Sequence, residues 1–343
     1  MKFKGTALII LTIFSAIYLS VFCGYEYMSG KFPEIIDELK PKNEISLPEE
    51  KKEEVKTESA RESSSLISSS AVNVASSEPA IGKITAKFLN PYTSNTSYGK
   101  IHLKNNTSEK LDIEALYKQK LKFKIAKNGE PQVLLLHTHT TESFMLNDND
   151  FYTAKDATRS RDSAKNMVAI GDIFEEKLKN AGIGVVHDAT IHDDPAYTGS
   201  YDRAKETILK NLKKYPSIKI VLDIHRDSIS GSGEKEKIKP IANINGKKYA
   251  QVMLVMGSQT GDIKNFPNWK ENLSLALKYQ QNLEVMYPGL ARSITFNSAK
   301  YNENITGGSL LIEIGSEANT LDEAKLSAAA AAEALTSLLN TLQ

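Results

Sequence analysis

The 343-residue chain has little of several features that would define a protein class. Its single cysteine, Cys23, excludes an intramolecular disulfide framework and any zinc or redox site of the CxxC type. Its 43 basic and 42 acidic side chains give a formal net charge of +1, which excludes a strongly basic nucleic-acid binder and an acidic solvating protein as descriptions of the whole chain. A metal site must therefore use histidine, aspartate and glutamate, and there are only six histidines.

The N-terminus carries a long uncharged run, Gly5–Tyr25, preceded by Lys2 and Lys4. At about 1.5 Å per residue a helix over this run spans the roughly 30 Å hydrocarbon core of a bilayer. The lysines favour a cytoplasmic N-terminus. A cleaved signal peptide is the alternative, but no small-x-small cleavage site ends the run. We therefore predict a transmembrane helix over residues 1–25 that anchors the protein in the cell membrane as a single-pass protein.

A polar segment follows the predicted anchor and contains too few apolar residues to form a core. The charged run Glu49–Glu54 leads into a stretch rich in serine, including Ser63–Ser65 and Ser68–Ser70. Such composition buries too little apolar surface to offset the conformational entropy of the chain. We interpret residues 26–80 as a disordered Glu/Lys/Ser-rich stalk.

The rest of the chain has the pattern of an α/β protein. Residues 81–127 are predicted to form a small β-rich lead-in, and residues 128–343 the catalytic domain. Apolar runs predict strands over Val133–Leu136, Gly184–Val186, Ile218–Ile224, Val252–Met256 and Leu310–Ile314. Amphipathic segments predict helices over Ala164–Asn180, Tyr201–Tyr215, Trp269–Tyr287 and Asp322–Leu342. This alternation favours a mostly parallel or mixed sheet flanked by helices, and Asn245-Gly246 predicts a hairpin.

Two histidines and a carboxylate directly follow the first of these strands. His139 and Glu142 have HxxE spacing, which lets a nitrogen and an oxygen converge on one ion at a turn. Imidazole and carboxylate together suit zinc. HxxE is also common by chance, so these side chains alone are equally compatible with polar groups that cap the end of a strand.

A third histidine, His225, ends the strand Ile218–Ile224, and Asp223 and Asp227 flank it. Either aspartate can accept the second imidazole proton and fix the tautomer. Because neighbouring strands of a parallel sheet end at the same edge, His225 completes a three-ligand set with the HxxE pair. Three protein ligands leave the fourth position of zinc open, which is typical of a catalytic site.

The last strand places a carboxylate, Glu313, between Ile312 and Ile314. A carboxylate among apolar residues is costly unless it is paired or used. Alternation puts Glu313 on the strand face opposite its two neighbours, where it can take a proton from water and pass it to a leaving amine. Glu317 competes for this role, and Arg203 and Arg226 are candidates for binding a substrate carboxylate.

Five blocks in a fixed order resemble the stage II sporulation protein P family: VLLLHTHTTESF, SRDSAKNM, HDATIHDDPAYTGSY, VLDIHRDS and LLIEIGSEANTLDEA. The resemblance covers about Leu111 to Leu342, together with the anchor and stalk. It implies a zinc-dependent cell-wall hydrolase related to the N-acetylmuramoyl-L-alanine amidases. Such an enzyme cuts the amide between glycan strand and stem peptide during engulfment, and some members also cut peptide cross-links.

The resemblance also implies site residues and partners. It points to His139, Glu142 and His225 as ligands of Zn²⁺ and to Glu313 as the base. Related amidases usually take their glutamate ligand from a later helix start, which here has no glutamate, so His137 and His187 stay open as alternative ligands. The implied partners are peptidoglycan and stage II sporulation proteins D and M, and nucleic acid is not among them. The implied location is the intermembrane space of the sporulating cell. A catalytically silent peptidoglycan-binding scaffold and a zinc carboxypeptidase remain the alternative functions.

Overall fold

The computed structural model describes residues 35–36 and 78–343 of the chain. The predicted anchor over residues 1–25 and nearly all of the predicted stalk over residues 26–80 lie outside the described residues. Within the described part, none of the helices is both long enough and apolar enough to cross a membrane. The anchor therefore stays a prediction from the sequence.

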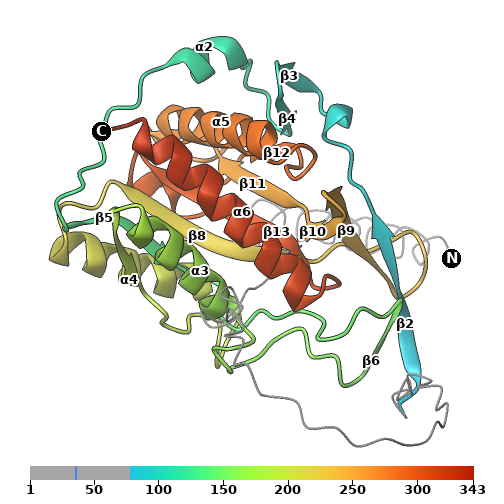
Figure 1. Ribbon diagram of the computed structural model, residues 1–343. Coiled ribbons are helices and arrows are strands. Elements are labelled where there is room, and N and C mark those ends of the chain that lie inside the picture. Colours follow the sequence, from blue (N-terminus) through green and yellow to red (C-terminus); the bar gives the residue numbers. More distant parts are fainter. Residues whose placement is uncertain (1–34, 37–77) are drawn as a thin grey trace, which may run out of the picture.

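Within the described residues, the larger sheet has nine strands (Figure 1). Eight follow the order β3-β4-β12-β11-β13-β8-β5-β7, and β1 pairs with β8. The strands β7, β5, β8 and β13 are parallel, whereas β11 is antiparallel to β13. This mixed sheet confirms the α/β fold class and all five predicted strands. The strands are β1 (Ile35–Ile36), β3 (Thr96–Tyr98), β4 (Ile101–Asn105), β5 (Pro131–Leu136), β7 (Gly184–His187), β8 (Ile220–Asp227), β11 (Val252–Gly257), β12 (Ile294–Asn297) and β13 (Ser309–Ser316).

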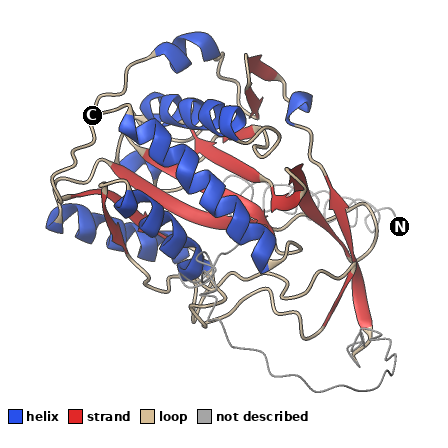
Figure 2. Ribbon diagram, viewed as in Figure 1, coloured by secondary structure: helices blue, strands red, loops and turns tan. Residues whose placement is uncertain are grey.

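The four predicted helices flank this sheet. The helices α3 (Met167–Asn180), α5 (Trp269–Met286) and α6 (Leu321–Asn340) lie together over one face, and α4 (Ser200–Lys214) covers the other (Figures 1 and 2). α3 starts three residues later than predicted because the Asn166 side chain caps it by accepting from the Val168 amide. α6 begins with the predicted capping box of Thr320 and Glu323.

The strand β5 shows why its sequence is continuously apolar. Leu135 packs in the core beneath α3, whereas Leu134 and Leu136 point to the opposite face and pack against Ala204 and Ile208 of α4. A strand buried on both faces has no solvent side to carry polar residues. The first polar residues therefore come where β5 ends, at the edge that carries the candidate site.

A smaller sheet has the strand order β10-β9-β2-β6. The strands β9 (Glu236–Ile244) and β10 (Lys247–Ala250) form the predicted hairpin, with positive φ angles at Asn245 and Gly246. β2 (Ala80–Lys87) pairs in parallel with β9 and antiparallel with β6 (Phe151–Thr153). The lead-in therefore does not pack as one unit: β2 joins the smaller sheet, β3 and β4 join the edge of the larger one, and the short helix α2 (Ile113–Lys118) packs near α5.

Candidate active site

The candidate site lies where β5, β8 and β13 present their polar residues. Glu313 of β13 is the register partner of His225 of β8, so adjacent strands hold the two residues side by side. Ile312 and Ile314 are buried in the core beneath the helices, so Glu313 points to the other face, as alternation predicted. On that face Leu311 packs with the tyrosines Tyr201 and Tyr301.

Asp223 fixes the orientation of the His225 ring. Its Oδ1 lies 2.8 Å from His225 Nε2. Asp223 also accepts hydrogen bonds from the Thr138 amide at 2.8 Å and the Thr138 hydroxyl at 2.6 Å. Burial raises the pKa of Asp223, but His225 and Thr138 outweigh burial and leave the pKa below its ordinary value. The carboxylate thus lies against Nε2, and a proton on that nitrogen would leave the His225 Nδ1 lone pair for the site. Of the two predicted partners, Asp223 fills this role, whereas Asp227 pairs with Arg292 at 2.5 Å.

Glu142 lies on the Nδ1 side of His225 and is completely buried. Its Oε2 is 4.0 Å from His225 Nδ1, and its Oε1 is 3.4 Å from an Arg159 nitrogen. Arg159 also pairs with Asp193 at 2.5 Å, and Asp193 accepts hydrogen bonds from the amide and hydroxyl of Thr141. Arg159 and Asp193 therefore hold the turn that carries Glu142, and one oxygen of Glu142 faces His225.

His139 is the third predicted zinc ligand. Its ring centroid is 5.3 Å from that of His225, and it stacks on Tyr197 at 4.5 Å with an interplanar angle of 9°. Ser200 Oγ lies 3.4 Å from His139 Nδ1. Burial, followed by the neighbouring His225 and Arg159, holds the pKa of His139 well below its ordinary value. The ring is therefore neutral, which is the form that binds a metal.

The arrangement is compatible with a shared zinc ion. Two imidazoles on one tetrahedral zinc, with Zn–N bonds of about 2.0–2.1 Å, have ring centroids about 5 Å apart. The 5.3 Å between His139 and His225 agrees with this, and Glu142 approaches His225 on its lone-pair side. The structure thus places both His139 and Glu142 next to His225.

The alternative ligands have other roles. His137 contacts the Ile224 carbonyl with Nδ1 at 3.0 Å and His187 with Nε2 at 3.0 Å, so both ring nitrogens are engaged. His192 is likewise engaged, with the His137 carbonyl and the Thr207 hydroxyl. His102 lies in β4, across the sheet from β5, and contacts Ser94.

The competing charged candidates are held by ion pairs or backbone contacts. Glu317 pairs with Arg226 at 3.4 Å and Lys237 at 3.3 Å, so two ion pairs engage its carboxylate. Arg203 donates to the carbonyls of His192, Thr198 and Ala196 and so fixes the loop before α4. Arg226 also donates to the Thr158 carbonyl at 2.6 Å.

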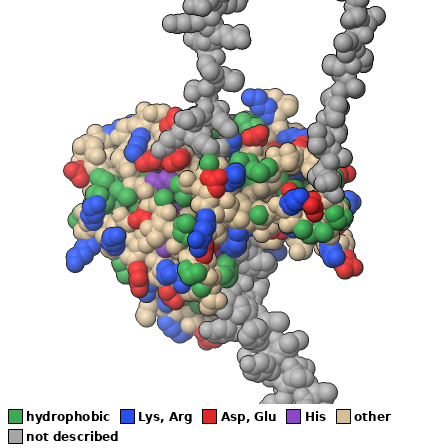
Figure 3. All heavy atoms as spheres, turned by 90° about the horizontal axis from the view of Figure 1, so that it is seen from below, with side chains coloured by type: hydrophobic (Ala, Val, Ile, Leu, Met, Phe, Trp, Pro, Cys, Tyr) green, Lys and Arg blue, Asp and Glu red, His purple; other side chains and the backbone are tan. Residues whose placement is uncertain are grey.

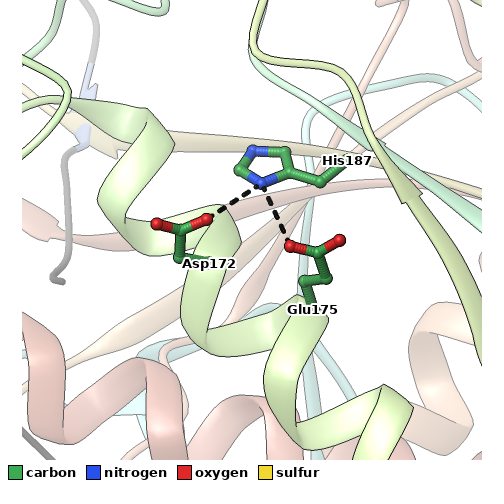
Figure 4. A group of neighbouring side chains, drawn as sticks. All are labelled: Asp172, Glu175 and His187. Atoms are coloured by element: carbon green, nitrogen blue, oxygen red, sulfur yellow. Dashed lines mark ion pairs between the residues drawn. The ribbon is translucent and has the colours of Figure 1, made fainter. Parts of the chain in front are cut away.

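Sequence reasoning missed a second cluster of metal-binding side chains. Asp172 and Glu175 of α3 and His187 of β7 bring one ligand atom each to within 4.8 Å of one another (Figure 4). Among the described residues no other set of three such side chains meets this criterion, the predicted zinc ligands included. The signal in the sequence is an Asp-x-x-Glu pair one helical turn apart, followed by a histidine at the end of the next strand.

Histidine rings are largely buried, and only small areas of them reach the face seen in Figure 3.

Comparisons with solved structures find distant likenesses. They include the CwlD amidase of Clostridioides difficile in complex with the GerS lipoprotein, with a TM-score of 0.38 and 12% identity over 62% of this chain and 100% of that chain. The catalytic domain of the amidase CwlV from Bacillus (Paenibacillus) polymyxa has a TM-score of 0.36 and 13% identity over 62% and 99%. A metallo-carboxypeptidase from Burkholderia cenocepacia has a TM-score of 0.35 and 11% identity over 64% and 60%. At this similarity they assign no activity to the chain.

Comparisons of sequence are more decisive. Stage II sporulation protein P of Bacillus subtilis (strain 168) is 30% identical over 213 residues, which is 59% of this chain and 49% of that protein. The chain thus aligns with about half the length of this relative. The sequence model of the stage II sporulation protein P family matches residues 24–336, a range that includes every candidate site residue described above. The chain therefore belongs to the stage II sporulation protein P family.

Proposed function

We propose that the chain is a membrane-anchored, zinc-dependent peptidoglycan hydrolase that cuts the N-acetylmuramoyl-L-alanine amide during engulfment. The single observation that carries the proposal is that His139 and Glu142 both lie next to His225, which is beside the buried carboxylate of Glu313. Family membership supports a role in sporulation. Cleavage of peptide cross-links by the same site stays open.

His139, Glu142 and His225 would hold the ion. Zinc, when bound, supplies a Lewis acid that polarises the amide carbonyl and lowers the pKa of water. The chain prepares this site in two ways: the neutral His139 ring offers a lone pair, and Asp223 directs the lone pair of His225. Arg159 pairs with one oxygen of Glu142, and the other oxygen of Glu142 lies 4.0 Å from His225 Nδ1.

Glu313 would move the proton. An amide is cut only if its nitrogen leaves protonated, so a general base that takes the proton from attacking water must return it to that nitrogen. Glu313 lies beside His225 on the neighbouring strand and on the same face of the sheet. The paired Glu317 is less suited, because ion pairs with Arg226 and Lys237 engage its carboxylate.

We further propose that residues 1–25 are an uncleaved anchor, residues 26–80 a stalk and residues 128–343 the catalytic domain outside the cytoplasm. The uncharged run Gly5–Tyr25 and the polar composition that follows it support this layout. The stalk would let the domain reach an immobilised wall, in the intermembrane space where stage II sporulation proteins D and M are the proposed partners.

Metal content and wall digestion by the same preparations test the proposal. His139→Ala and His225→Ala should each lose zinc from this site and release no stem peptides, while circular dichroism shows that they stay folded. His102→Asn is the control, because His102 is buried in β4 away from the site. Full zinc and activity in His225→Ala would show that the proposed site is wrong.

A further inference from the structure

We propose that Asp172, Glu175 and His187 form a second, separate site for a divalent transition-metal ion such as Zn²⁺. The three side chains join helix α3 to the end of strand β7 (Figure 4). This proposal does not depend on the catalytic function proposed above, since it concerns other residues.

The distances between these side chains suit a metal ion better than hydrogen bonds. His187 Nδ1 lies 3.5 Å from Asp172 Oδ1 and 4.0 Å from Glu175 Oε2. Both exceed the usual length of about 2.7–2.9 Å for a charge-assisted hydrogen bond. Two ligand atoms on one tetrahedral zinc, with bonds of about 2.0–2.2 Å, lie about 3.4 Å apart. The distance from His187 to Asp172 is therefore close to that between two ligands of one ion, and all three ligand atoms lie within 4.8 Å of one another.

The neighbouring His137 determines which nitrogen of His187 has a lone pair. His137 Nδ1 lies 3.0 Å from the Ile224 carbonyl, which only accepts, so this nitrogen carries a proton. In the tautomer with the proton on Nδ1, the other ring nitrogen of His137 is an acceptor. Its Nε2 therefore accepts from His187 Nε2 at 3.0 Å. With its proton on Nε2, His187 presents the lone pair of Nδ1 toward the two carboxylates.

Two carboxylates and an imidazole with ligand atoms within 4.8 Å of one another offer a cation two oxygens and a nitrogen, while the other oxygen of Glu175 pairs with Lys179 at 2.6 Å. The second nitrogen of His187 is oriented by a hydrogen bond, as the free nitrogen of a metal-bound histidine usually is. The His187 side chain is only 5% exposed, whereas that of Asp172 is 26% exposed, so an ion can enter from solvent on the carboxylate side. The ligand set of one imidazole and two carboxylates suits zinc and similar ions.

The helix α3 is shaped to admit the two histidine rings. Gly171 lies next to Asp172, and a Cβ at this position would come within 2.2 Å of His187 Nε2 and 2.8 Å of His137 Nε2. Glycine inside a helix is less favourable than alanine. Gly171 therefore makes room for the packed rings of His137 and His187 at a cost in helix stability.

An ion at this site would brace the catalytic strand ends. It would hold His187, which holds His137, which in turn bonds the carbonyl of Ile224, the residue before His225. We therefore assign the ion a positioning role, because none of its ligands belongs to the predicted catalytic set. The competing explanation is a protonated His187 in an ordinary ion pair with the carboxylates, which binds no metal.

Metal counting in the folded full-length chain separates these explanations. The measurement compares bound zinc per chain and thermal stability with and without zinc for Asp172→Asn and Glu175→Gln. Asp202→Asn and Glu206→Gln are matched controls on exposed positions of the neighbouring helix α4. We expect each site variant to lose one ion per chain, or to bind it at least about tenfold more weakly, while both controls match the parent.

The His225→Ala background isolates the second site from the proposed catalytic one. There we expect one remaining ion, which Asp172→Asn removes together with the stabilisation that zinc gives. Unchanged zinc content and stability in Asp172→Asn would overturn the second site and leave the proposed function intact. Zinc that is lost only in Asp172→Asn, and never in His225→Ala, would confirm the second site and overturn the proposed catalytic one.

Discussion

Replacing Asp223 by asparagine tests how the chain prepares His225. Asp223 Oδ1 receives the Thr138 amide and faces His225 Nε2, so it must remain an oxygen in the variant. The new amide group then faces the Thr138 hydroxyl, which can accept. Asp223→Asn therefore keeps the contacts and removes only the negative charge.

The size of the effect follows from this change. A hydrogen bond to a charged group contributes about 1.5–3 kcal/mol, and one between neutral groups about 0.5–1.5 kcal/mol. The difference of about 1–1.5 kcal/mol corresponds to zinc affinity about 5–12-fold weaker, which reaches only the lower end of the roughly 10–100-fold losses known for such supporting residues. Competition titration with a zinc-binding dye measures the affinity.

A matched control separates this effect from a loss of packing. Asp156 also accepts hydrogen bonds from the amide and hydroxyl of one threonine, Thr153, at 2.7 and 2.9 Å. No histidine contact of Asp156 is present among the described residues. Asp156→Asn should keep the zinc affinity of the parent. If Asp223→Asn bound zinc as tightly as Asp156→Asn, the proposed role of Asp223 would be refuted.

Three other predictions concern the base, the core and the anchor. Glu313→Gln should keep zinc and wall binding but release stem peptides at least about 100-fold more slowly, because it cannot accept a proton; near-parent rates would move the role to Glu317. Burial holds the pKa of Glu303 well above its ordinary value, so the folded state retains a proton that the unfolded chain loses, and this contribution to stability falls as pH rises. Urea unfolding measures the free energy of unfolding of Glu303→Gln and of the parent. The free energy of the variant should rise relative to that of the parent between about pH 5 and about pH 8. A difference that does not change with pH would contradict the burial argument. N-terminal sequencing of the membrane-extracted protein should find the run Gly5–Tyr25 intact, and a mature N-terminus near Tyr25 would refute an anchor.

The elements with local sequence signals were predictable. The strand Leu310–Ile314 lies inside β13 because a continuous apolar run suits a strand buried on both faces. Asn245-Gly246 forms the predicted turn, and Thr320 with Glu323 forms the predicted capping box. The HxxE spacing and the position of His225 after an apolar strand placed the candidate ligands on neighbouring strand ends.

The features that depend on long-range packing were not predictable. The parallel pairing of β2 with β9 joins residues more than a hundred positions apart, and no local pattern encodes it. Asp172 and Glu175 meet His187 only because α3 packs over β7 in one particular register. The choice of Asp223 over Asp227 likewise depends on Arg292, which pairs with Asp227 from a distant segment.

Mass spectrometry of purified peptidoglycan after digestion by the full chain tests the central proposal most directly. The account predicts free stem peptides that begin with an intact L-alanine amino group, together with glycan strands stripped of peptide. It also predicts that chelation of the metal abolishes both products and that added zinc restores them. Wall that binds the chain but yields no soluble product would contradict the account and favour a scaffold, and shortened stem peptides still attached to glycan would favour a carboxypeptidase.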